Sequence, residues 1–127
     1  LTEATIVVIE ESKSGLALAK RSISSYVESQ GDKLHLANII AVMDTIRGAM
    51  SMISQDRLAA IIVRSMACIQ RVLIDSDSMP DQLVLETLAD AMTSLEYYIE
   101  SMDMKQNMND ALLKLSEESL ASIGYGA

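Results

Sequence analysis

Three positions close together in the chain, Asp44, Arg47 and Gly48, have the types and spacing that suit recognition of a charged group. Residues three and four apart lie on one face of a helix, so the cation and the glycine fall one turn after the carboxylate. A cation at that spacing can contact a phosphoryl group, and a glycine leaves space for a partner. Because a glycine inside a helix costs about 1 kcal/mol relative to alanine, we expect Gly48 to serve a purpose.

The same helical face also has a structural interpretation. Gly48 would then allow a second helix to pack closely, and Asp44 would form a surface ion pair with Arg47. Ser51 extends this face by one further turn in either case. The spacing alone does not decide between a recognition surface and a packing surface.

His35 and Cys68 are the single histidine and the single cysteine of the chain, which restricts the chemistry available. They cannot supply a zinc site of His and Cys ligands, and Cys68 lies in an apolar stretch without an activating neighbour. His35, two residues after Lys33, is an alternative phosphoacceptor, although a surface histidine at a helix start is the simpler interpretation. No glycine-rich phosphate loop is present. We therefore expect no enzyme activity, no metal and no cofactor.

Two groups of charged residues are further candidates for partner binding. Arg57, Arg64 and Arg71 recur every seven residues, and such a basic ridge would attract an acidic partner. The segment 86–103 is acidic, and its Glu96 and Glu100 would suit a basic partner. Each group also has a plainer interpretation as a solvated helix face.

The composition limits the class of protein and of partner. The chain has 127 residues, a formal net charge of −8 and 50% hydrophobic residues, without Trp or Phe. The negative charge disfavours nucleic acid and anionic membranes, since both attract clustered Lys and Arg. No apolar stretch approaches the roughly 20 residues of a membrane span. We therefore expect a cytoplasmic protein, not inserted in a membrane, whose partners are proteins.

Helical periodicity extends over almost the whole chain and defines the elements that must position these residues. Apolar residues recur at steps of three and four, which predicts one buried face for each helix. Gly31 suits the left-handed position after the first helix, and Pro80 suits the start of the fourth. The predicted helices are 2–30, 34–53, 56–73, 80–103 and 108–123. Because short connections favour antiparallel neighbours, we predict a single all-α domain over residues 1–127, an antiparallel up-and-down helical bundle.

The same periodicity predicts which side chains face the core. The stripe of the first helix comprises Ile9, Leu16, Ala19, Ile23 and Tyr26. The more regular track of the fourth helix comprises Leu85, Leu88, Met92, Leu95, Ile99 and Met102. In the fifth helix the predicted track is Leu112, Leu115, Ser119 and Ile123. Since the fourth track would also allow two chains to pair, a homodimer remains an alternative.

Two sets of residues resemble known families. The heptapeptide Asp44–Met50, DTIRGAM, is similar to the His-x-x-Lys-Gly motif of histidine-phosphotransfer (HPt) domains, with Asp44 at the phosphoacceptor position. The segments 88–100 and 117–125 resemble the Pil-Chp hybrid chemotaxis kinases of the ChpA and PilL type and the related FimL group. This resemblance runs from the second predicted helix to the C-terminus. It implies a four-helix HPt-like bundle with an additional helix, acting in chemotaxis-like control of type IV pili and twitching motility.

The departure from the HPt motif implies a different mode of action. A carboxylate at position 44 removes the phosphoramidate chemistry, and an aspartyl phosphate would need a magnesium site that is not evident around Asp44. We therefore predict a non-catalytic pseudo-HPt domain that docks a receiver domain, a kinase domain or a polar scaffold protein at the cell pole. Because the sequence begins with Leu1, we expect it to be part of a larger signalling protein. The alternatives are an active phosphotransfer domain that uses His35 and a purely structural or dimerising bundle.

Overall fold

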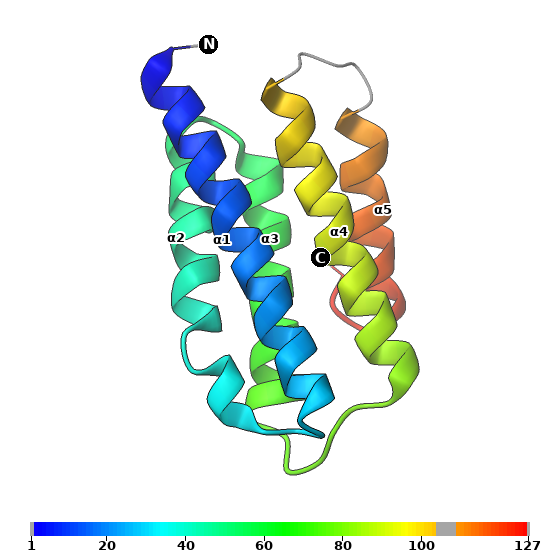
Figure 1. Ribbon diagram of the computed structural model, residues 1–127. Helices are drawn as coiled ribbons and strands as arrows, with labels where there is room; N and C mark the ends of the chain where they lie inside the picture. The colour runs from blue at the N-terminus through cyan, green and yellow to red at the C-terminus, as the bar shows by residue number, and fades with distance from the viewer. Residues whose placement is uncertain (1, 104–108, 127) are drawn as a thin grey trace.

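Every regular element in residues 2–103 and 109–126, the part of the chain that the computed structural model describes, is helical. The elements are α1 (Glu3–Glu28), η1 (Lys33–Leu36), α2 (Ile39–Met52), α3 (Asp56–Cys68), η2 (Ile69–Ile74), α4 (Gln82–Asp103) and α5 (Asn109–Ser122). The segment η1 is a 3-10 helix, and η2 has π-helical geometry. Consecutive α-helices run antiparallel (Figure 1). The predicted all-α antiparallel bundle is confirmed.

All five α-helices contribute to one core, and α5, at one side of the bundle, adds Leu113 and Leu120 to it (Figure 1). α1 packs against α2 and α4, α2 also packs against α3, and α5 packs against α4 and α3 (Figure 1). All five predicted inward residues of the first helix are buried. In α4 the predicted track is buried as far as Ile99, and Met102 is partly buried. Among the described residues, none of the helices combines the length and the apolar character needed to span a bilayer.

Schellman-type turns end α1, α2 and α5 and keep the following connections short. After α1, the N–H of Gly31 donates to the carbonyl of Tyr26 at 2.9 Å. Gln30 already has a positive φ of 61°, so the left-handed conformation begins one residue before the predicted Gly31. Ser54 takes the equivalent position after α2 with a φ of 63°, and Gly124 takes it after α5 with a φ of 94°.

The predicted second, third and fourth helices each differ from the structure. The predicted helix 34–53 divides into η1 and α2, because the Asp32 side chain accepts the N–H of Leu34 and caps a separate 3-10 turn. The predicted helix 56–73 changes at Ile69 to π geometry. Pro80 precedes α4 instead of starting it, and Asp81 provides the carbonyl for the first α-helical hydrogen bond. The predicted start of the fifth helix at residue 108 lies outside the described residues.

The buried face of α5 differs from the prediction by one position. Leu113, Ser116 and Leu120 are buried, whereas Leu115 is 52% exposed. The hydroxyl of Ser116 donates to the carbonyl of Ala91 on α4 at 3.0 Å. The sequence of this helix contains two possible inward-facing tracks at the same spacing. The track that is buried contains the polar Ser116, so the pattern of apolar residues alone did not favour it.

Candidate functional site

The motif residues lie together on the outer face of α2. Asp44 and Ser51 are exposed, while Arg47 and Gly48 are half-buried. The Nε of Arg47 donates to Oδ1 of Asp44 at 2.7 Å, and the two side chains are 37% and 56% exposed. The face therefore presents a closed ion pair to the solvent, and neither charge is free.

Gly48 has no packing role among the described residues. A Cβ atom placed on it would meet none of their atoms within 4 Å, so the interpretation in which Gly48 allows close helix packing is wrong. The close approach of two helices occurs at Gly15 of α1, where a Cβ would lie 3.1 Å from Cδ1 of Ile46. Sequence reasoning missed Gly15, because its role depends on a helix that is distant in sequence. Because Gly48 has no side chain, it instead leaves open space on the outer surface of α2 beside the Asp44–Arg47 ion pair.

His35 lies in η1 and not on α2, and its side chain is 41% exposed. Its Nε2 is 3.9 Å from Oδ2 of Asp32, so its charged neighbour is an anion. Lys33 donates to the carbonyls of Ile74 and Ser76 and thereby ties η1 to the end of η2. Because that ammonium group is directed to backbone carbonyls, it does not support a phosphoryl group on His35.

Cys68 is unsuited to nucleophilic chemistry. It is fully buried at the end of α3, and this burial raises the pKa of its thiol to about 11. The thiol therefore stays protonated near neutral pH, whereas the thiolate is the reactive form. Within residues 2–103 and 109–126, no three side chains of His, Cys, Asp or Glu form a group that could hold a metal ion.

Arg57, the first residue of the predicted basic ridge, joins α3 to α5. Its guanidinium pairs with Asp110 and contacts both carboxylate oxygens of Glu117, at 2.7 and 3.1 Å. The hydrogen bonds to Glu117 raise the pKa of Arg57, and the same bonds lower the pKa of the Glu117 carboxyl. Bidentate contacts of this kind fix geometry as well as charge.

The second arginine of the ridge is also used within the chain. The Nε of Arg64 donates to the carbonyl of Tyr125 at 2.9 Å and holds the segment after α5 against α3. Arg71 is exposed on η2. The prediction of a free cationic ridge is therefore corrected, because α5 and the segment after it bind two of the three guanidinium groups.

Glu96 and Glu100 border a groove between α1 and α4. Oε1 of Glu96 is 2.6 Å from Nζ of Lys20 on α1, so this carboxylate bridges the two helices. Glu100 is exposed and lines a hollow of about 290 Å³ together with Glu10 and Lys13 of α1. The two predicted residues therefore occupy the edge of a groove, and Glu96 is already paired.

Tyr98 connects α4 to the turn between α2 and α3, and it lies within the segment that carries the family resemblance. Its hydroxyl donates to Oε1 of Gln55 at 2.7 Å, and the side chain is buried. Its neighbour Tyr97 is 58% exposed. Tyr98 therefore has a structural role, whereas Tyr97 is part of the surface.

Comparison with known proteins assigns a family to this arrangement. The FimL C-terminal domain family matches residues 1–120. The chain belongs to this family. It is 46% identical over 125 residues to Scaffold protein FimL of Pseudomonas aeruginosa, and the match covers 98% of this chain but 22% of that protein. No solved structure gives a significant match.

The family assignment supports one part of the sequence resemblance. The FimL group, inferred from segments 88–100 and 117–125, is confirmed, and the family match also includes α1. The HPt-like character and the relation to the ChpA and PilL kinases stay predictions.

We expect Gly48→Ala to raise the free energy of unfolding by about 0.5–1 kcal/mol, because alanine favours a helix and its Cβ enters open space. Gly31→Ala is the matched control and should lower it, since Gly31 has a φ of 105° and a Cβ there would lie 3.1 Å from Met79. Urea unfolding followed by circular dichroism measures both. A loss of stability in Gly48→Ala would contradict an open surface at this position.

We expect Glu117→Gln to destabilise the chain near neutral pH and to reduce its acid sensitivity. Arg57 holds the folded-state pKa of Glu117 below its ordinary value of 4.5, so the stabilisation is present above that pH. It is lost as the pH falls through the lowered pKa, and the difference in Tm between the two proteins should shrink there. Melting curves between about pH 7 and about pH 3 measure this difference.

Glu118→Gln removes an exposed carboxylate one residue away and is the control for this series. It should leave the Tm nearly unchanged at each pH. A Tm difference for Glu117→Gln that stays constant across the series would contradict a stabilising pair with Arg57.

Proposed function

We propose that this chain is a protein-docking domain of a FimL-type scaffold protein and that it transfers no phosphoryl group itself. In this proposal it is a pseudo-HPt module whose outer α2 face binds a receiver domain, a kinase domain or another scaffold protein. Gly48 carries the proposal, because it weakens the helix, packs against no other residue that the structure describes and lies beside the exposed Asp44–Arg47 pair.

The contacts of the candidate groups favour docking over chemistry. Arg47, the cation that would neutralise a phosphoryl group, is bound to Asp44. An exposed ion pair contributes only about 0–1 kcal/mol, so a partner can replace it with contacts of its own at low cost. A surface of this kind suits reversible binding and does not require the fold to rearrange.

The family suggests a setting for this binding. The relative from Pseudomonas aeruginosa is named a scaffold protein, which supports protein partners for this chain as well. We place the domain in the cytoplasm, in chemotaxis-like control of type IV pili and twitching motility, where its partners would bring it to the cell pole. We also propose that residues 1–127 form a single domain of a larger protein.

The decisive experiment measures binding of purified receiver and kinase domains from the same signalling system. Gly48→Leu places a bulky side chain on the outer face of α2 without an internal clash, and we expect it to weaken binding at least about tenfold. Ala111→Leu, at an exposed position of α5, is the matched control and should bind as the wild type does. Titration calorimetry gives the affinity, and equal binding by Gly48→Leu and wild type would refute docking at this face.

A second measurement on the same mixtures separates docking from phosphoryl transfer. We expect no phosphate on this chain after incubation with a phosphorylated receiver or an autophosphorylating kinase domain. Label that is lost in His35→Ala but kept in Asp44→Ala would show an active phosphotransfer domain and overturn the proposal. A mass that rises with concentration, without affinity for either partner, would instead favour the dimerising bundle.

A further inference from the structure

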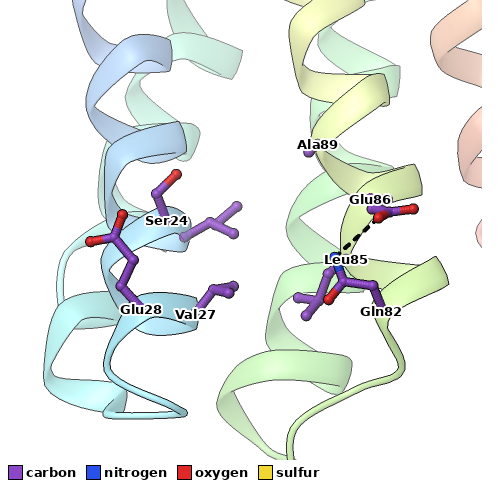
Figure 2. Close-up of a pocket in the computed structure, with 8 residues that line it drawn as sticks. Ser24, Val27, Glu28, Gln82, Leu85, Glu86 and Ala89 are labelled. Carbon is purple, nitrogen blue, oxygen red and sulfur yellow. Dashed lines mark hydrogen bonds between the residues drawn. The ribbon is translucent and has the colours of Figure 1, made fainter.

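A groove between α1 and α4 lies on a different side of the bundle from the outer α2 face. Figure 1 shows α2 and α4 on opposite sides of α1. The groove has a hollow of about 260 Å³ between the end of α1 and the start of α4 (Figure 2). A smaller hollow of about 50 Å³ shares Ile23, Ser24 and Ala89 with it. The hollow bordered by Glu96 and Glu100 lies further along the same two helices, beyond the Lys20–Glu96 bridge.

The floor of this groove is apolar and its rims carry negative charge. Val27 of α1 and Leu85 of α4 lie between the two helices, and Glu28 and Glu86 lie at the two rims (Figure 2). Both carboxylates are exposed, and neither forms an ion pair with a described residue. The amide of Gln82 donates to Glu86 at 3.0 Å, which positions this carboxylate without neutralising it.

We propose that this groove binds a helical segment of a partner protein that presents an aliphatic side chain flanked by Lys or Arg. The apolar floor accepts the aliphatic side chain, and the unpaired carboxylates at the rims attract the cations on either side of it. A volume of about 260 Å³ is below the roughly 300–1,000 Å³ of pockets for drug-sized ligands, so it suits an anchoring side chain better than a cofactor.

The geometry also selects the form of the partner. The groove runs between two helices, and the described residues contain no strand whose edge a partner strand could join. A helix that lies in such a groove contacts it through residues at i, i+3, i+4 and i+7. An acidic partner is disfavoured because the chain has a net charge of −8 and the rim carboxylates add local repulsion.

This surface does not rest on the proposed function of the outer α2 face. Its residues belong to α1 and α4, whereas Asp44, Arg47 and Gly48 belong to α2. A domain with two separate docking surfaces can hold two partners at once, which is what a scaffold requires. Binding at either surface can be lost by mutation without loss at the other, so the two proposals can be tested apart.

The probe is a fluorescent peptide of about 14 residues, or four helical turns, that contains only Leu and Lys, with the leucines on one helical face. A matched peptide carries Glu in place of each Lys. We expect the 127-residue chain to bind the Lys peptide and not the Glu peptide, as measured by fluorescence anisotropy. Absence of binding to the Lys peptide would overturn the proposal.

Charge variants separate a specific groove from general attraction to an acidic protein. We expect the double variant Glu28→Gln and Glu86→Gln to weaken binding about three- to tenfold, since charge pairs that are exposed to solvent contribute little each. The control double variant, Glu11→Gln and Glu118→Gln, removes the same charge from exposed positions outside the groove. Equal weakening by the two double variants would show non-specific attraction and overturn the proposal.

A third variant tests the apolar floor. Ala89→Leu narrows the groove from an exposed position of α4. We therefore expect at least about tenfold weaker binding and an unchanged free energy of unfolding. Ala111→Leu on α5 is again the control. Unchanged binding by Ala89→Leu would overturn the proposal. A wild-type dimer in sedimentation that Ala89→Leu abolishes would show a second copy of the chain in the groove, and would overturn it too.

Discussion

Each helix of the bundle buries only one face, and the rest of the structure depends on this constraint. The core consists mainly of aliphatic and methionine side chains, together with Tyr26 and Tyr98, and adaptable methionines such as Met43 and Met92 are fully buried in it. The outer faces are then left for α5 or for a partner. α5 covers one such face with the buried Leu113 and Leu120 and adds polar contacts, among them the Arg57–Glu117 pair and the hydroxyl of Ser116.

Most of the core was predictable because burial follows the helical period. The inward-facing residues predicted for the first and fourth helices were correct, since each of these helices has a single apolar face. The register of α5 was not predictable, because two tracks compete and the choice rests on Ser116 and a carbonyl 25 residues away. The break before α2 likewise depends on Asp32 capping a separate 3-10 turn.

The candidate site was predictable only as far as spacing determines it. Spacing correctly placed Asp44, Arg47 and Gly48 on one face of a helix, because i, i+3 and i+4 neighbours share a face. Whether another helix packs against Gly48 depends on the path of that helix. The close approach to α2 is made by α1, and it occurs at Gly15 and Ile46. The spacing of the arginines predicted a shared face, but it carried no information about the helix that would cover Arg57.

The ion-pair partners of each charged group distinguish surfaces that a partner protein can use from surfaces that stabilise the fold. The Asp44–Arg47 pair lies within one helix, so a partner can take either group and leave the bundle intact. Arg57 joins two helices through Asp110 and Glu117, so a partner that competed for it would also loosen α5. Docking as proposed at the α2 face and at the rims of the α1–α4 groove would therefore leave the bundle intact, whereas Arg57 and Arg64 of α3 hold the fold together.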